Sequence, residues 1–254
     1  MALVTGASRG IGRAIALRCA REGADVVINY AHREDAAQTV AEAVRTIGRR
    51  ALVIRADVQI RGQVEAMVMT TEREWGRIDI LVNNAAVLVF GNALTMSVDA
   101  LETAMRINVQ SLLHCVQCVA PLMTARRSGR IINIAATSAL GTSVKGIAPH
   151  VTAKAGVVIL TKTLAQELGA AGITVNAVLP GAIDTEITLP GGELHEALRP
   201  IRAAQLERTL LGRAGTADDV AAVVAFLASD DAAFMTAQAL SVDGGRTDFL
   251  THSG

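Results

Sequence analysis

Thr5-Gly6-Ala7-Ser8-Arg9-Gly10-Ile11-Gly12 is the stretch that decides the fold of this chain. A short apolar run at residues 2–5 precedes it, and an Ala-rich helical pattern at residues 10–22 follows it at once. Glycines at this spacing allow a tight turn and close backbone approach, so that a pyrophosphate can bind the amides at the helix N-terminus. A lone glycine triplet is often only a turn, but its position between a strand and a helix predicts a dinucleotide site.

Short apolar runs alternate with longer helical patterns along the rest of the chain. Strands are predicted at residues 2–5, 25–30, 51–56, 78–83, 130–135, 173–179 and 239–242. Helices are predicted at residues 10–22, 35–48, 63–75, 99–127, 149–169 and 216–229. A strand as apolar as Ile131-Ile132-Asn133-Ile134 is typical of a sheet covered on both faces. The alternation predicts an α/β fold over residues 1–254: a single-domain, Rossmann-type, doubly wound parallel sheet flanked by helices on both faces.

Length and composition fit one such domain and exclude several function classes. The 254 residues are 51% hydrophobic and 19% charged, enough for a large core. Because 24 basic residues balance 24 acidic ones and aromatics are only 2%, we expect no nucleic-acid partner. No run reaches the ~18 apolar residues of a membrane span, and no signal peptide is recognisable, so we expect a cytoplasmic protein without a membrane partner. The three cysteines form no disulfide framework, and Cys115 and Cys118 lack a second pair for a zinc site, so no metal is expected.

Residues 182–212 interrupt the alternation of strands and helices. They contain Pro190-Gly191-Gly192 and Pro200, which favour a long excursion with one or two short helices. The excursion leaves the strand predicted at residues 173–179, and ligands of doubly wound sheets bind beyond the carboxyl ends of the strands. We interpret it as a substrate lid; a plain surface insertion is the alternative.

Several motifs make nearly the whole chain resemble the short-chain dehydrogenase/reductase family. The glycine loop fits the family's TGxxxGxG fingerprint, and Asn83-Asn84-Ala85-Ala86 resembles its NNAG motif, with alanine for the last glycine. Asp57-Val58 is similar to its adenine-contacting segment, and Asn108 to its proton-relay asparagine. Further similar motifs are Pro180-Gly181 with Thr185, Leu211-Gly212-Arg213 and Val242-Asp243-Gly244-Gly245.

The resemblance implies a set of residues that hold a nicotinamide dinucleotide. They are Gly6, Ser8, Arg9, Gly10, Ile11, Gly12, Tyr30, Arg33, Asp57, Val58, Asn84, Ala85, Lys154, Pro180, Gly181, Ile183 and Thr185.

The end of the second predicted strand distinguishes NAD from NADP. An NAD enzyme usually has an acid there, which holds the ribose 2′-hydroxyl and repels a 2′-phosphate. This chain reads Ile28-Asn29-Tyr30-Ala31-His32-Arg33, with no acid before Glu34. Because Arg9 and Arg33 can both reach a phosphate, we expect NADP(H) rather than NAD(H). Alternatively, Arg33 is a solvated residue at a helix start.

The resemblance implies a Tyr-x-x-x-Lys catalytic pair, with the two residues one helical turn apart. In the family the tyrosine exchanges a proton with the substrate oxygen, and the lysine lowers the pKa of the tyrosine and holds the nicotinamide ribose. The matching stretch here is His150-Val151-Thr152-Ala153-Lys154, so a histidine stands in the tyrosine position. The only tyrosine, Tyr30, is placed by the fingerprint at the adenosine end of the site. A tyrosine-based mechanism is therefore excluded.

A neutral imidazole at His150 is a competent general base near pH 7, because its ordinary pKa is about 6.5 and a neighbouring lysine cation favours the neutral form. The same cation opposes the protonated form that carbonyl reduction requires. The residue that holds the substrate oxygen is also irregular. The stretch Asn133-Ile134-Ala135-Ala136-Thr137-Ser138 has alanines where the family has serines, so either Ser138 or Thr137 takes this role, with Ser138 preferred.

Two hypotheses follow for the function. The first is an NADP(H)-dependent oxidoreductase that transfers a hydride between nicotinamide and a secondary alcohol or ketone, similar to a 3-oxoacyl reductase or acting on a related carbonyl substrate. Its catalytic residues are His150, Lys154, Ser138 or Thr137, and Asn108. The second is a catalytically impaired relative that binds the dinucleotide in a structural or regulatory role. The resemblance also implies a homotetramer, or a homodimer, packed through the helices at residues 99–127 and 149–169.

Overall fold

The predicted strands form one parallel sheet in the computed structural model, which describes residues 1–141, 144–185 and 199–247. The strands are β1 (Ala2–Val4), β2 (Val26–Tyr30), β3 (Ala51–Arg55), β4 (Ile80–Asn83), β5 (Gly129–Ile134), β6 (Ile173–Pro180) and β9 (Ala239–Val242). Their order across the sheet is β3-β2-β1-β4-β5-β6-β9, and every neighbouring pair is parallel. The winding reverses between β1 and β4, which is where doubly wound folds bind their ligands.

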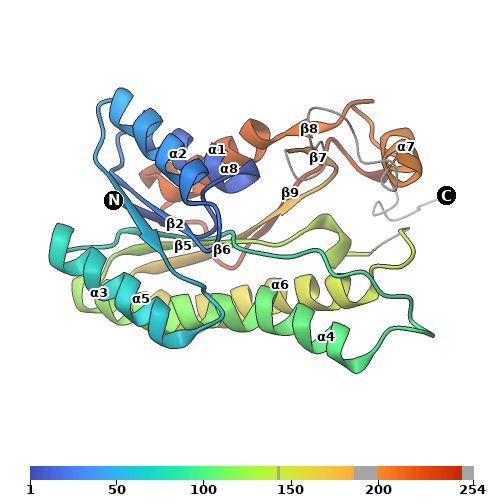
Figure 1. The fold of residues 1–254 in the computed structure, drawn as a ribbon, viewed down its shortest axis with the longest axis horizontal. Helices are drawn as coiled ribbons and strands as arrows, with labels where there is room; N and C mark the ends of the chain where they lie inside the picture. The colour runs from blue at the N-terminus through green and yellow to red at the C-terminus, as the bar shows by residue number, and fades with distance from the viewer. Residues whose placement is uncertain (142–143, 186–198, 248–254) are drawn as a thin grey trace.

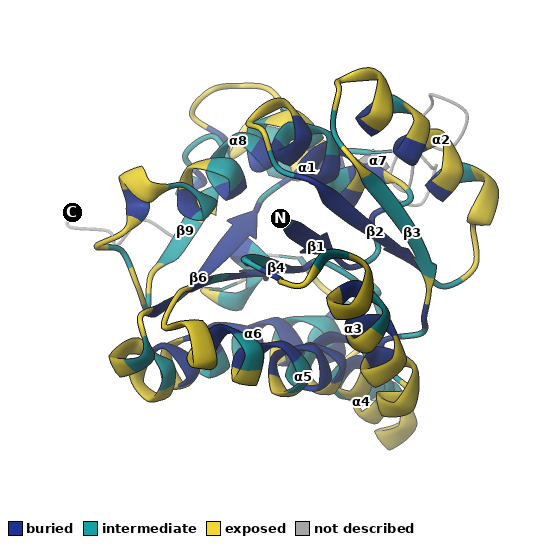
Figure 2. Cartoon of the chain, turned by 90° about the vertical axis from the view of Figure 1, so that its left-hand side faces the viewer, coloured by how far each residue is buried: buried dark blue, intermediate teal, exposed yellow. Residues whose placement is uncertain are grey.

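Helices cover both faces of the sheet (Figure 1). One layer contains α1 (Gly10–Arg21), α2 (Glu34–Thr46) and α8 (Ala217–Ala228). The other contains α3 (Arg61–Trp75), α4 (Val98–Met105), α5 (Ser111–Arg126) and α6 (Ala148–Leu168). Figure 2 shows the central strands buried between the two layers, with the exposed residues on the outward sides of the helices. The α/β doubly wound fold predicted from the sequence is confirmed.

Successive residues of a central strand pack against different layers. Ala2 and Val4 of β1 belong to the core beneath α1, α2 and α8, whereas Leu3 belongs to the core beneath α3, α5 and α6. Adjacent side chains of a strand point to opposite faces of the sheet. A strand between two helical layers must therefore be apolar at every position, which is why these strands show continuous apolar runs.

The helix predicted at residues 99–127 is not continuous. A π-helical turn at Arg106–Gln110 separates α4 from α5. Within this turn the side-chain amide of Asn108 donates to the carbonyl of Ala104 (3.0 Å) and to that of Val87 (3.1 Å). A side-chain donor that enters the backbone ladder disrupts its regular pattern, and π turns are frequent at functional sites.

Three elements lie beyond the carboxyl ends of the strands, at the right of Figure 1. The short strand β7 (Ile183–Asp184) pairs in parallel with β8 (Gly215–Thr216), and the helix α7 (Arg199–Glu207) lies between them in the chain. Part of the expected lid, residues 186–198 with Pro190-Gly191-Gly192, falls outside the described residues.

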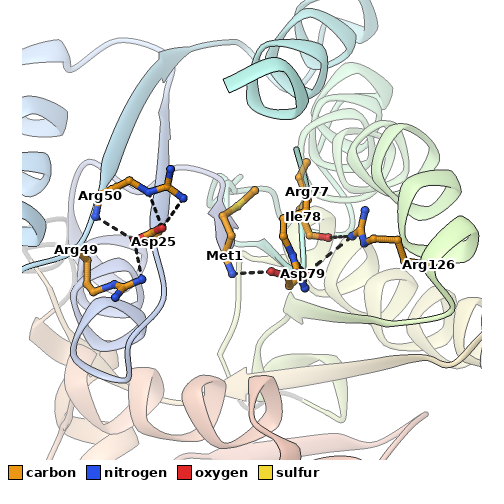
Figure 3. A network of polar contacts seen from close by, with 8 residues as sticks. All are labelled: Met1, Asp25, Arg49, Arg50, Arg77, Ile78, Asp79 and Arg126. Carbon is orange, nitrogen blue, oxygen red and sulfur yellow. Dashed lines mark hydrogen bonds and ion pairs between the residues drawn. The ribbon is translucent and has the colours of Figure 1, made fainter. Parts of the chain in front are cut away.

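Ion pairs close the opposite, amino-terminal edge of the sheet (Figure 3). Asp25, just before β2, pairs with Arg49 at 2.8 Å and Arg50 at 2.7 Å. Asp79, just before β4, pairs with Arg77 at 2.6 Å and with the amino group of Met1 at 2.7 Å. Burial raises the pKa of both carboxyls, but their hydrogen bonds and cations outweigh it and hold each pKa below its usual range. These ion pairs connect the segments that precede β2 and β4 at this edge of the sheet.

Candidate active site

The glycine loop joins β1 to α1 at the carboxyl edge of the sheet. Gly6 and Gly10 have φ angles of +61° and +57°, in the left-handed region that favours glycine. Arg9 is the N-cap residue of α1, and its side chain makes no capping hydrogen bond. The first-turn amides of α1 are therefore not covered by a cap side chain, an arrangement suited to phosphate binding.

Gly12 and Asn84 pack this loop against the end of β4. A Cβ atom at Gly12 would lie 2.4 Å from the carbonyl oxygen of Gly6 and 2.5 Å from Nδ2 of Asn84. Asn84 Nδ2 donates to the carbonyls of Thr5 (2.9 Å) and Gly6 (3.1 Å). Thr5 Oγ1 in turn accepts from the backbone amides of Asn84 and Ala85. The segments after β1 and β4 thus fix one another.

We expect Gly12→Ala to weaken dinucleotide binding at least tenfold and to destabilise the fold by about 1–3 kcal/mol, the usual cost of over-packing. The new methyl group must displace Gly6 or Asn84. Fluorescence titration with NADPH and thermal unfolding measure the two effects. Gly62→Ala, in the first turn of α3, is the matched control because no atom lies within 4 Å of its added Cβ. Unchanged NADPH affinity in Gly12→Ala would contradict the assignment of this loop.

Asn29, which the sequence analysis did not single out, braces the loop from β2. Its Oδ1 accepts from the amide of Gly6 (3.2 Å), and its Nδ2 donates to the carbonyl of Ala56 after β3 (2.9 Å). Tyr30 follows it at the end of β2 and is buried. Burial, together with a hydrogen bond to Glu34, raises the pKa of the Tyr30 hydroxyl. No simple sequence pattern marks Asn29, because its partners come from other strands.

The predicted phosphate-binding arginines differ in their surroundings. Arg33 is exposed, but its guanidinium pairs with Asp35 at 3.2 Å, so a phosphate would have to compete with that carboxylate. Arg9 is exposed at the N-cap of α1. A third cation, Arg55, lies opposite Tyr30 in the β2–β3 register and donates to the carbonyl of Ala31 (3.3 Å). Arg55 could not be predicted from the residues around it, because the pairing of β2 with β3 places it beside Tyr30.

The predicted adenine segment follows β3. Both carboxylate oxygens of Asp57 lie near Gln59, whose backbone amide donates to Oδ1 at 3.0 Å and whose side chain donates at 3.2 Å. Val58 is buried, and its carbonyl lies 3.1 Å from Nδ1 of His114 on α5. Asp57 therefore shapes its own turn, while Val58 fixes the turn to the helix below.

Two ionisable side chains lie one turn apart on α6. Lys154 is buried, and its Nζ donates to the carbonyl of Ile134 at the end of β5 (2.8 Å). Burial lowers the pKa of Lys154 to about 8. His150 is half-buried, and burial followed by the charge of Lys154 lowers its pKa to about 4. At pH 7 the site therefore holds a neutral imidazole beside an ammonium group.

The carbonyl of Val87 links His150 to Asn108. It lies 3.3 Å from Nδ1 of His150 and accepts a hydrogen bond of 3.1 Å from Asn108 Nδ2. The loop that carries Val87 is attached to the start of α6 further on, where Gly91 bonds to Gly146 and Ala148. The role of Val87 could not be predicted from the sequence, because every residue has a backbone carbonyl.

The two candidate hydroxyls have different environments. Both belong to the 3-10 turn at Thr137–Ala139, which packs against α6. Thr137 is 3% exposed, and its Oγ1 donates to the carbonyl of Pro180 at the end of β6 (3.4 Å). Ser138 is partly exposed, and its hydroxyl has no hydrogen bond to any residue within the described ranges. Of these two residues, Ser138 is therefore the one whose hydroxyl makes no hydrogen bond within the described ranges.

The Pro180-Gly181 turn holds the end of β6 against the end of β9. The amide of Gly181 donates to the carbonyl of Val242 (3.0 Å), and a Cβ at Gly181 would lie 2.6 Å from that of Asp243. Ile183 is buried in β7, and Thr185 is the last described residue before the gap at 186–198.

A small cavity of about 10 Å³ lies beside the site, with room for about one water molecule. Its walls include Asn83 and Asn108, and the Oδ1 atom of each is buried without a hydrogen-bond partner among the described residues. Buried acceptors of this kind commonly bind an ordered water. Over the part of the chain that is described, no group of three or more His, Cys, Asp or Glu side chains is placed to hold a metal ion, and no helix is long and apolar enough to cross a membrane.

Comparisons with known proteins agree with this fold. A family described as "Enoyl-(Acyl carrier protein) reductase" matches residues 6–247. The chain is 42% identical over 245 residues to the 3-oxoacyl-[acyl-carrier-protein] reductase FabG of Staphylococcus epidermidis. The matched region covers 96% of this chain and 97% of that relative. It is 41% identical over 249 residues to (2S)-[(R)-hydroxy(phenyl)methyl]succinyl-CoA dehydrogenase subunit BbsD of Thauera aromatica, with coverage of 98% and 97%. A short-chain dehydrogenase from Burkholderia cenocepacia, solved in complex with NADP, superposes with a TM-score of 0.85 at 35% identity over 96% of each chain.

The fold, the glycine loop and these relatives define an oxidoreductase of the dinucleotide-binding Rossmann class. The chain belongs to the short-chain dehydrogenase/reductase family, which confirms the resemblance noted in its sequence.

Proposed function

We propose that the protein is an NADP(H)-dependent oxidoreductase that interconverts a secondary alcohol and a ketone. The observation that carries this proposal is the pair His150 and Lys154, which lie one turn apart on α6, the helix that packs against the 137–139 turn. The residues fit a nicotinamide dinucleotide, because the start of α1 has no side-chain cap and Gly12 lies where a Cβ would collide with Gly6. When bound, the nicotinamide supplies the acceptor or donor of hydride.

Each side chain of the site has a proposed role. Lys154, fixed by Ile134, orients the ribose on the nicotinamide side and contributes positive charge. Ser138 holds the substrate oxygen, while Thr137 supports the turn that carries Pro180. His150 occupies the position of the family's tyrosine and exchanges the proton. Asn108 positions the loop at Val87 and borders the cavity that would hold a relay water.

The proposed substrate is a 3-oxoacyl or 3-hydroxyacyl thioester or a related carbonyl compound. Two relatives support this class: the name of one specifies a 3-oxoacyl group on a carrier protein, and that of the other a succinyl-CoA derivative. Residues 182–212 would close over it as a lid. Assays of NADPH oxidation with 3-oxoacyl-CoA esters and simple ketones, and of NADP⁺ reduction with the matching alcohols, test the proposal. NADPH binding without turnover of any compound would instead support the catalytically impaired relative.

NADP(H) preference is proposed to rest mainly on Arg9. Removing one charge-assisted contact to a phosphate costs roughly 1.5–3 kcal/mol. We therefore expect Arg9→Ala to raise the Kd for NADPH at least tenfold and to leave the Kd for NADH unchanged. Isothermal titration with both cofactors measures this, with Arg21→Ala at the far end of α1 as the control. An equal loss for both cofactors would show that Arg9 does not contact the 2′-phosphate.

We also propose that copies of the chain associate through α4, α5 and α6 into a homotetramer or homodimer. Val98 at the start of α4 and Ile159 on α6 are 71% and 62% exposed, so this layer of helices carries apolar side chains that a second copy could cover. Light scattering coupled to size-exclusion chromatography gives the oligomeric state directly.

A further inference from the structure

We propose that His150 is a general base held in a single tautomer, with Nδ1–H committed to the carbonyl of Val87 and Nε2 left to accept the proton of a substrate hydroxyl. The inference rests on the proposed function and adds what that function leaves open: which partner carries the proton, and in which direction the site is competent at neutral pH.

The tautomer follows from the chemistry of the partner. A backbone carbonyl is only an acceptor, so the contact of 3.3 Å between Val87 and Nδ1 of His150 requires a hydrogen on Nδ1. In a neutral imidazole the other nitrogen, Nε2, then carries a lone pair and no hydrogen. The Val87 carbonyl is itself fixed, because Asn108 donates to it and the loop is attached to α6 through Gly91. A base oriented by a third group is the usual arrangement for proton abstraction.

The surroundings favour the neutral ring. The segments at 85–91 and 137–140, which flank it, contain no ionisable side chain. Burial lowers the His150 pKa most, and Lys154 on the same helix lowers it further; together they outweigh the hydrogen bond to Val87, which raises it. Within the described residues, the elements next to the start of α6 carry the charged residues Asp99 and Glu102 on α4, Arg106 after it and Lys145 before α6.

The proposed step balances as an alcohol oxidation. The O–H bond of the alcohol breaks and its proton goes to Nε2 of His150. The C–H bond at the same carbon breaks with its electron pair, for which a bound oxidised nicotinamide would supply the hydride acceptor, and the C=O bond forms. The imidazolium beside Lys154 is unfavourable, so the half-buried ring then releases the proton to solvent.

If His150 is the base, only one of the two directions should have a kcat/KM that depends on pH between pH 5.5 and 7.5. The equilibrium constant fixes the ratio of the two directions at each pH, and that ratio changes tenfold per pH unit because one proton is released. Oxidation uses neutral His150, whose population is constant above pH 5, whereas reduction needs the imidazolium. Between pH 5.5 and 7.5, below the Lys154 pKa of about 8, kcat/KM for oxidation should stay flat and kcat/KM for reduction should fall about 100-fold.

His150→Tyr provides the contrast, because a phenol has an ordinary pKa of about 10 and is protonated at pH 5.5 even where Lys154 lowers that value. In that variant kcat/KM for oxidation should rise with pH from 5.5, while kcat/KM for reduction should be flat at the low end of the range. Thr152→Ala, an exposed position on the same helix, is the control and should reproduce the wild-type profiles. A wild-type enzyme with flat reduction and rising oxidation would overturn the proposal.

A second measurement reads the tautomer without turnover. Nitrogen-15 NMR of histidine-labelled protein, with the His150 signals assigned from a His150→Gln variant, should show Nδ1 protonated and Nε2 unprotonated from pH 5.5 to 7.5. Protonation at Nε2, or a titration midpoint above pH 6, would overturn the inference even if the enzyme is active. Bound NADPH with the expected tautomer but no turnover in either direction would instead refute the proposed oxidoreductase.

Discussion

His150→Phe is expected to lower kcat/KM for alcohol oxidation by about 10²–10⁴-fold, the range typical of a lost general base. Phenylalanine fills a similar volume on α6 but has no nitrogen, so it can neither donate to Val87 nor accept a proton. The glycine loop is remote in the chain and is fixed by its own contacts to Asn84. The Kd for NADPH should therefore stay within about twofold of the wild-type value.

Steady-state kinetics at pH 7 and fluorescence titration with NADPH measure these two quantities in the same preparations. Thr152→Ala is again the control for a substitution on this helix. If His150→Phe retained more than a tenth of the wild-type activity, the proton would have to pass to another group.

Lys154→Met is expected to abolish turnover while making the protein more stable. The ammonium is buried, and its pKa of about 8 lies below the ordinary 10.5 because burial disfavours the charge. A shift of that size corresponds to about 3 kcal/mol of lost stability in the charged state. Methionine removes this cost at similar volume, although it also removes the hydrogen bond to Ile134. The Kd for NADPH should rise at least tenfold as the ribose loses its partner.

The pH dependence of this stabilisation has a definite sign. Between pH 8 and 10.5 the unfolded chain binds a proton at Lys154 that the folded chain does not, so wild-type stability rises with pH there. The advantage of Lys154→Met should therefore be full below pH 8 and decline toward pH 10.5. Denaturant unfolding at pH 7 and pH 10 measures it, with exposed Lys162→Met on the same helix as control. Equal differences at both pH values would show that the buried amine is not the cause.

The sequence predicted the fold because the signals that define it are local. Apolar runs such as Ile131-Ile132-Asn133-Ile134, separated by amphipathic stretches, specify strands covered by helices on both faces. The glycine loop needs only its own backbone geometry, and Gly6 and Gly10 take the positive φ angles that such a turn requires. The prediction of one continuous helix at residues 99–127 was wrong. Its sequence pattern is helical throughout, but a π-helical turn interrupts it at Asn108, whose side chain bonds to Val87 in a distant loop.

What the sequence by itself determined is the class of protein and the set of side chains available for chemistry. Only the tertiary structure decided which hydrogen bonds those side chains make. It placed the Thr137 hydroxyl against the carbonyl of Pro180 and, among the described residues, left the hydroxyl of Ser138 without a hydrogen bond. It also brought a backbone carbonyl of the loop after β4 to Nδ1 of His150. The physical reason is that protonation state, tautomer and hydrogen-bond commitment depend on burial and on partners distant in the chain, which residue type and spacing do not encode.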